Sequence, residues 1–182
     1  EDDLPPPSRP EQTGSPDSLV DWASLGRQGR RFVTGGPDAE ALKSFFKTPL
    51  VAPIRVYVGL NSADTPEARA RLALEELKRV GAFERSVMVL ATPTGTGWID
   101  PAGQDPLEYL FRGDIATVAV QYSYLNSPLT LLTGGGLAIH SLFGLARVNL
   151  GFQTERLLTF SLPVPQGRLA QSMAFFKPPG IE

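Results

Sequence analysis

Three short apolar runs in the first two thirds of the chain have the length and composition of buried β-strands. They lie at residues 54–60, 86–91 and 115–122 and are rich in Val, Ile, Leu, Ala and aromatic side chains. The second run is almost unbroken by polar residues, which is typical of a strand covered on both faces. The pattern therefore predicts three strands, the first of them beginning just after Pro53.

An amphipathic helix is predicted between the first two strands. One helical face is apolar and the other has charges at four-residue spacing; the members are Ala70, Ala73, Leu74, Leu77 and Val80 on the first, and Glu67, Arg71, Glu75 and Arg79 on the second. Asp64 is the predicted N-cap, because Pro66 and Glu67 follow it in the order of a capping box. The helix should end at Gly81, with its charged face in solvent.

A second, short helix is expected at residues 106–111, which completes the order strand, helix, strand, helix, strand. Such a unit forms a right-handed parallel sheet. The expected fold class is therefore α/β, as an incomplete three-layer unit with a short parallel βαβαβ sheet. An irregular helix at residues 137–148 and a strand at residues 157–162 are expected to follow it.

The two ends of the chain differ from this central unit. Residues 1–17 are rich in Pro, Ser, Glu and Asp, a composition typical of a linker, and residues 26–36 signal neither helix nor strand. We expect a Pro-rich linker at 1–30, the α/β unit at 31–128 and an appendage at 129–182. The run from Leu129 to Val148 is nearly uncharged, but its three consecutive glycines make it a marginal membrane span, and a half-buried helix is an equal alternative.

Composition narrows the classes of function. The 182 residues are 42% hydrophobic and 20% charged, as in folded proteins, while 18 Gly and 17 Pro indicate many turns. A net charge of -2 gives no footprint for nucleic acid, so no such partner is expected. Zero cysteines exclude disulfides and thiolate sites. No signal peptide is recognisable at the start of the sequence, and no cofactor or metal is expected.

The best candidate site is the loop after the second strand, because α/β proteins bind ligands beyond the carboxyl ends of their strands. It comprises Thr94, Gly95, Thr96, Gly97 and Trp98. Asp100 stands where a dinucleotide fingerprint needs its third glycine, and Pro101 argues against a helix that opens immediately there. The loop is either a site for an oxyanion or another ligand, or a tight turn between strand and helix.

Other chemistry is sparse. His140 is the only histidine and lies in an apolar, glycine-rich stretch, so we expect a structural role for it. No Gly-x-Ser-x-Gly occurs, which leaves no recognisable hydrolase nucleophile and hence no predicted catalytic residue. Aspartates near strand ends, namely Asp64, Asp100, Asp105 and Asp114, are explained by caps and turns. Trp98, Tyr122 and Tyr124 are expected in core or edge packing, with a pocket lining as the alternative.

Several segments resemble one family in order and spacing. They include the residues around Arg31, the first strand, the Ser62 to Glu67 turn, Gly95-Thr96-Gly97-Trp98, Asp105 to Tyr109 and Gln121-Tyr122-Ser123-Tyr124. Over about residues 2–129 they resemble the opening part of the catalytic domain in bacterial membrane-anchored α/β-hydrolases. This resemblance implies a serine-hydrolase fold, association with the bacterial membrane and a place for the Gly95 to Trp98 loop near the oxyanion side of the pocket.

A second resemblance covers about residues 131–182. Leu131 to Leu137, Arg147 to Phe152 and Glu155 to Phe160 are similar to the junction between a membrane helix and the extracytoplasmic domain of macrolide-exporter-type ABC transporter permeases. The leading hypothesis is a truncated α/β-hydrolase-like domain without independent catalytic activity. The alternatives are a membrane-associated permease-like accessory, which would use Leu129 to Val148, and a non-catalytic binding module. Without a further strand beside it, the run at 115–122 would leave a free sheet edge open to self-association.

Overall fold

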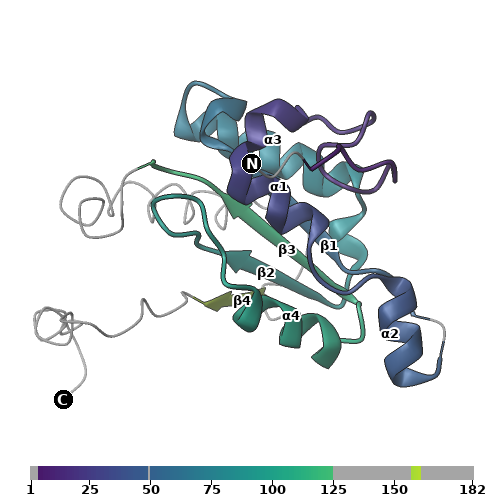
Figure 1. Ribbon diagram of the computed structural model, residues 1–182. Helices are drawn as coiled ribbons and strands as arrows, with labels where there is room; N and C mark the ends of the chain where they lie inside the picture. Colours follow the sequence, from purple (N-terminus) through teal and green to yellow (C-terminus); the bar gives the residue numbers. More distant parts are fainter. Residues whose placement is uncertain (1–3, 49, 125–156, 161–182) are drawn as a thin grey trace, which may run out of the picture.

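The computed structural model describes residues 4–48, 50–124 and 157–160, and within them a parallel sheet forms the centre of the molecule (Figure 1). Its strands are β1 (Ile54–Val58), β2 (Val87–Ala91), β3 (Ile115–Val120) and β4 (Leu157–Phe160), in the spatial order β1-β3-β2-β4. All three pairings are parallel, with Val56 and Leu90 both beside Val118. The predicted α/β class and parallel βαβαβ unit are confirmed.

The strand order corrects one expectation. We predicted a free edge on the run at 115–122, but β3 lies between β1 and β2 and is paired on both sides. The connection from β1 to β2 leaves a gap one strand wide, and β3 fills it. The strand predicted at 157–162 is present as residues 157–160 and pairs with β2. Self-association through a sheet edge stays a prediction, and among the described strands it would use β1 or β4.

Helices cover both faces of the sheet. The larger ones are α1 (Gly26–Thr34), α2 (Ala39–Phe46), α3 (Pro66–Arg79) and α4 (Pro101–Leu110), and short 3-10 turns lie at η1 (Trp22–Leu25), η2 (Leu60–Ser62) and η3 (Ala82–Glu84). The crossovers through α3 and α4 run in opposite directions across the sheet, so right-handed connections place these helices on opposite faces. Side-chain contacts from β1 place α1 on the α4 face.

The helix starts follow local rules that the sequence analysis applied only in part. The cap of α3 is Thr65, whose side chain accepts from the Ala68 N–H, and not Asp64 as predicted. The cap must directly precede the first helical residue, which here is Pro66. Pro101 begins α4 immediately after its cap Asp100, contrary to our expectation, because a proline at the first helical position has no N–H to leave unpaired.

The N-terminal part is more ordered than its composition suggests. Thr13, Ser15 and Val20 are buried, and residues 26–34 form α1, which crosses the domain boundary predicted at residue 30. One glycine in α1 serves packing: Gly29 lies against the ring of Tyr57, where a Cβ would collide. Hydrogen bonds from Ser18 and Leu19 to Glu76 hold the N-terminal segment on α3, so its attachment does not depend on apolar contacts alone.

The core is built mainly from strand residues and the inner faces of α1 and α3. Fully or nearly buried side chains include Leu25, Val33, Ile54, Val56, Ala73, Leu77, Val89, Ile115 and Ala119. The predicted apolar face of α3 is thus confirmed at Ala73 and Leu77. Among the described residues no helix combines the length and hydropathy that a membrane span requires. His140, the run from Leu129 to Val148 and the predicted helix at 137–148 lie outside these residues.

Candidate functional site

The predicted loop lies at the carboxyl edge of the parallel sheet, between β2 and α4. Thr94, Gly95, Thr96, Gly97 and Trp98 make a turn that begins three residues after β2 ends and closes before Asp100 caps α4. The segments that follow β1 and β3 lie at the same edge, because all these strands are parallel. This is the edge at which open α/β sheets bind ligands.

Most of the polar groups in the loop bond within it. The Thr94 N–H donates to the Trp98 carbonyl at 2.9 Å, and the Gly97 N–H donates to the Thr94 carbonyl at 2.8 Å. The Trp98 N–H donates to Thr94 Oγ1 at 3.1 Å, and this hydroxyl lies 3.0 Å from Thr96 Oγ1. The N–H groups of Gly95 and Thr96 donate in none of the hydrogen bonds found among the described residues. They are the unpaired donors of this part of the loop; Thr96 is exposed, whereas Gly95 is buried.

Two side chains from neighbouring strands fix Gly97. The buried Tyr57 hydroxyl, from β1, donates to the Gly97 carbonyl at 2.9 Å. The amide of Gln121, just after β3, also lies against Gly97, so any Cβ at position 97 would meet both groups. Gly97 also has φ +88°, a left-handed conformation that favours glycine. Burial, with a smaller contribution from Tyr124, raises the pKa of Tyr57, so its hydroxyl stays protonated and remains a donor.

Gln121 also links the loop to the segment after β1. Its Oε1 accepts from the Leu60 N–H at 3.4 Å and its Nε2 donates to the Ser123 carbonyl at 2.9 Å. The segment after β1 has a second support, because Arg69 of α3 donates to the Ala63 carbonyl at 2.9 Å. The three loops at this edge therefore support one another, and the backbone of the candidate site is held from several directions.

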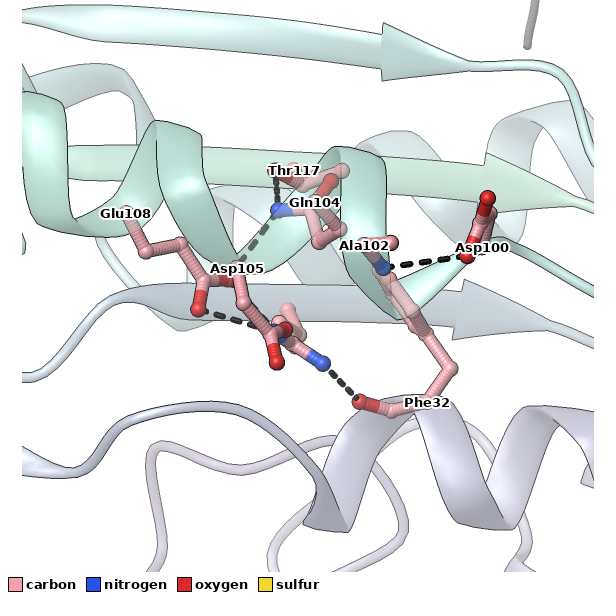
Figure 2. Close-up of polar contacts among 8 residues, drawn as sticks. Phe32, Asp100, Ala102, Gln104, Asp105, Glu108 and Thr117 are labelled. Atoms are coloured by element: carbon pink, nitrogen blue, oxygen red, sulfur yellow. Dashed lines mark hydrogen bonds and ion pairs between the residues drawn. The ribbon is translucent and has the colours of Figure 1, made fainter. Parts of the chain in front are cut away.

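A buried polar network fixes α4, the helix that follows the loop (Figure 2). Arg55, on β1, donates to both carboxylate oxygens of Glu108, at 2.7 and 2.8 Å, and to Asp105 at 2.6 Å. It also donates to the Phe32 carbonyl of α1 at 3.0 Å. Gln104 joins Glu108 to Thr117 of β3, at 3.0 and 2.8 Å. One guanidinium thus joins a strand to two helices.

The one cation of this network, Arg55, is paired with two carboxylates. Burial by itself lowers the pKa of Arg55, but the hydrogen bonds and charges of Glu108 and Asp105 outweigh it and raise the pKa. The Arg55 side chain is 6% exposed and that of Glu108 is 0% exposed, so neither charge could be buried without the other. The network is best understood as support for α4, since its polar atoms already have partners, with the exception of Gln104 Oε1.

The other residues singled out from the sequence have mostly local roles. Asp100 caps α4, Asp114 accepts from the Ser86 N–H and hydroxyl, and Asp105 pairs with Arg55. Of the core or edge packing expected for Trp98, Tyr122 and Tyr124, a core position is excluded for Trp98 and Tyr124, whose side chains are 39% and 58% exposed, while Tyr122 is partly buried. Within the described ranges, no three His, Cys, Asp or Glu side chains gather as metal ligands would.

Sequence reasoning missed the residues that hold the site together. Arg55 interrupts an otherwise apolar strand, and that interruption is the one signal that could have marked a buried charge. Glu108 and Gln104 are four residues apart and so share a helix face, but nothing local shows that this face is buried. Tyr57 resembles any other strand aromatic until its contact with Gly97 is known.

Comparisons with known proteins agree with this architecture. Residues 54–142 match the model of the alpha/beta-hydrolase family, and residues 1–37 match the model of the alpha/beta-hydrolase family N-terminus. Neither the curated proteins nor the solved structures gave a match. The resemblance of residues 131–182 to transporter permeases finds no support, and residues 131–142 fall within the hydrolase match. The parallel α/β sheet and the two matches together show that this chain contains an alpha/beta-hydrolase family domain, with the N-terminal region of that family before it.

Proposed function

We propose that this hydrolase-family domain uses the loop Thr94 to Trp98 to bind the polar end of a ligand, and that the chain by itself does not catalyse acyl transfer. One observation supports the binding role above all. Among the residues that the structure describes, the Gly95 and Thr96 N–H groups have no hydrogen-bond partner, while the rest of the loop is bonded and clamped by Tyr57.

Two adjacent N–H groups on a fixed backbone suit a carboxylate, a carbonyl oxygen or an oxyanion. Fixing matters because a donor that is already oriented needs no reorganisation when the ligand arrives. The Tyr57 hydroxyl, from β1, and Gln121, just after β3, supply that fixing. The exposed hydroxyl of Thr96 is one more polar group at the same place.

Acyl transfer additionally needs an activated nucleophile. The hydroxyls of Ser24 and Ser62 lie 2.7 Å from each other, and Ser24 donates to the Asp21 carbonyl. These serine hydroxyls are therefore bonded to oxygen atoms and not to an imidazole that could act as their base. The single histidine of the sequence, His140, is not in the described part, and no Gly-x-Ser-x-Gly is present in the 182 residues. Donors without a nucleophile can bind an acyl group but have no covalent intermediate to stabilise.

The catalytic half of the proposal is tested with a fluorophosphonate probe and an activated ester, p-nitrophenyl acetate. We expect no stoichiometric labelling and no ester hydrolysis above that of the Gly97→Ala variant. Labelling of one serine in every molecule, located by peptide mass spectrometry, would contradict this half.

The binding half is tested by titrating butyrate against the ¹⁵N-labelled chain. The amide resonances of Gly95 and Thr96 should shift most, and the Gly97→Ala variant should lose these shifts. Gly26→Ala is the matched control, because Gly26 also has a positive φ, +66°, but has open space where a Cβ would lie. If butyrate left both amides unmoved, the loop would have to be regarded as a turn.

A further inference from the structure

A patch of exposed apolar side chains lies where α2 meets the end of α4. Phe45, Val51 and Leu110 are 67%, 50% and 71% exposed, values that are unusual for residues of this size. With Phe46 and Tyr109 they form what we call the α2–α4 patch. Nothing in the candidate site accounts for it.

Ring contacts join the two helices at the aromatic centre of the patch, beside the exposed Leu110 of α4 and the exposed Val51 after α2. The ring of Phe45 lies edge-on to both Phe46 and Tyr109, with centroids 4.9 and 5.2 Å apart. The backbone of Val51 lies against Gly113, in the turn that ends α4, which brings the segment after α2 to the end of α4. Leu42, fully buried beneath α2, packs against the same glycine and anchors the helix. The patch is therefore a fixed feature of the fold.

Three exposed cations belong to the elements that carry the patch. Lys43, Lys47 and Arg112 are all exposed, and the Arg112 guanidinium stacks 5.3 Å from the ring centroid of Phe46. The nearest acidic side chain along α2 is Glu40, a turn earlier. The chain as a whole has a net charge of -2, so this positive region is opposite in sign to the protein.

The patch and the candidate loop lie at opposite ends of α4. This helix begins at the carboxyl edge of the sheet, next to Trp98, and ends in the turn before β3, at the amino edge. Figure 1 shows α2 at the far end of the sheet from the loop that precedes α4. A partner seated on the patch would leave the Gly95 and Thr96 N–H groups open.

We propose that the α2–α4 patch seats the domain on an anionic lipid surface. Phenylalanine and leucine enter the boundary between headgroups and acyl chains, and tyrosine places its hydroxyl among the headgroups. Lysine and arginine bury their apolar stems and place their charged ends beside the lipid phosphates. A second copy of this chain would bring the three cations against three identical ones. An anionic bilayer is complementary in both charge and hydrophobicity.

The backbone at two of the cations allows a test that separates charge from folding. Lys47 and Arg112 have φ of 61° and 53°, the left-handed region in which glycine is favoured over any side chain. The double variant Lys47→Gly, Arg112→Gly removes two charges from the patch while relieving backbone strain. The fold should therefore keep its thermal stability.

The experiment is co-sedimentation of the purified chain with phosphatidylcholine vesicles that either contain or lack phosphatidylglycerol. Binding should require phosphatidylglycerol and weaken with salt. The double variant should bind about tenfold or more weakly, and Phe45→Ser about tenfold more weakly. The matched controls are Arg27→Gln with Arg71→Gln, which removes two exposed cations from α1 and α3, and Leu19→Ser, at a position that is 52% exposed. Both controls should bind as the wild type does.

Three results would overturn the proposal. They are equal binding to both vesicle types, equal loss of binding in the patch and control variants, and no vesicle binding at all. Insertion of the run from Leu129 to Val148 would give binding that the patch variants leave unchanged, so it is distinguished from this surface. Dimerisation that disappears in Phe45→Ser, without vesicle binding, would assign the patch to a second copy.

Discussion

Two buried glutamates, Glu108 and Glu76, use the same chemistry to different ends. Each carboxylate is 0% exposed and each is paired with an arginine, at 2.7 Å in both cases. The partner of Glu108 is Arg55, only 6% exposed in the middle of β1, whereas the partner of Glu76 is Arg79, 20% exposed and on the same helix.

The remaining contacts show what each glutamate holds. Glu108 joins α4 to the sheet, and with it the end of the candidate loop. Glu76 accepts from the Ser18 hydroxyl at 2.7 Å and the Leu19 N–H at 3.0 Å, and Arg79 also donates to the Pro10 carbonyl. It therefore holds the N-terminal segment on α3. The comparison teaches that the buried pair Arg55–Glu108 fixes a helix on the sheet. The pair Arg79–Glu76, whose arginine is partly exposed, fixes a segment of linker-like composition on a helix.

The largest effect is expected from Glu108→Ala. Removing this carboxylate leaves the buried Arg55 guanidinium with the partly exposed Asp105 as its remaining charged partner, beside the Phe32 carbonyl. We expect a loss of about 3–5 kcal/mol of unfolding free energy, measured by urea denaturation. The double variant Arg55→Met, Glu108→Leu should recover most of that loss, because two apolar side chains need no partner. A double variant as unstable as Glu108→Ala would show that charge burial is not the cause.

A smaller effect is expected from Glu76→Ala. The Arg79 side chain can turn to water, so the main loss is that of the charged hydrogen bonds from Ser18 and Leu19, about 2 kcal/mol. Ser18→Ala removes one of these bonds and should cost about half as much. Should Glu76→Ala match Glu108→Ala in urea, the distinction between core and margin would be wrong.

The same pair differs in the pH dependence of stability. Burial by itself raises the pKa of Glu76, but the hydrogen bonds from Arg79, Ser18 and the Leu19 N–H outweigh it and lower the pKa. A carboxyl group with a lowered pKa in the folded state stabilises the fold above its unfolded pKa, about 4.3. This contribution is lost as the pH falls below that value and through the folded pKa.

The test is the melting temperature of wild type and Glu76→Gln between pH 7 and 3. The difference between them should be largest near neutral pH and shrink as the solution is acidified below about pH 4.3. A constant difference over the whole range would mean that the Glu76 carboxyl has the same pKa in the folded and unfolded chain.

The smallest effect is expected from Asp105→Asn. This carboxylate bonds Arg55 at 2.6 Å but its side chain is 37% exposed, so it behaves more like a surface ion pair. We expect a loss of about 0.5–1 kcal/mol in urea denaturation. A loss as large as that of Glu108→Ala would place the dominant charge of the network at its exposed side.

Local sequence patterns were sufficient for the first three strands and the long helix, but α1 and α2 were not predicted, and the short helix expected at 106–111 is found at 101–110. The strands predicted at 54–60, 86–91 and 115–122 are found at 54–58, 87–91 and 115–120, and the long helix is found at 66–79. These succeed because periodicity and caps act between residues that are close in the chain. The position of β3 between β1 and β2 could not be predicted in this way, since a parallel crossover does not specify how many strands it passes.

The supporting contacts could not be predicted for a related reason. Arg79 was assigned to a solvated ladder with Arg71, but it pairs with Glu76 and reaches Pro10, 69 positions away. Arg55 and Glu108 are 53 positions apart. The candidate loop was located from topology alone, whereas its clamp by Tyr57 depends on a contact across 40 positions. Pairings of this kind become visible only when the tertiary fold is known.

The most direct test of this account is hydrogen exchange by mass spectrometry on Glu108→Gln and Glu76→Gln, under conditions in which both variants are folded. Glu108→Gln should speed exchange in residues 92–110 and leave residues 9–20 at the wild-type rate, and Glu76→Gln should do the reverse. If both variants loosened the same segments to the same extent, or if Glu108→Gln left residues 92–110 unchanged, the two glutamates would not hold separate parts of the molecule.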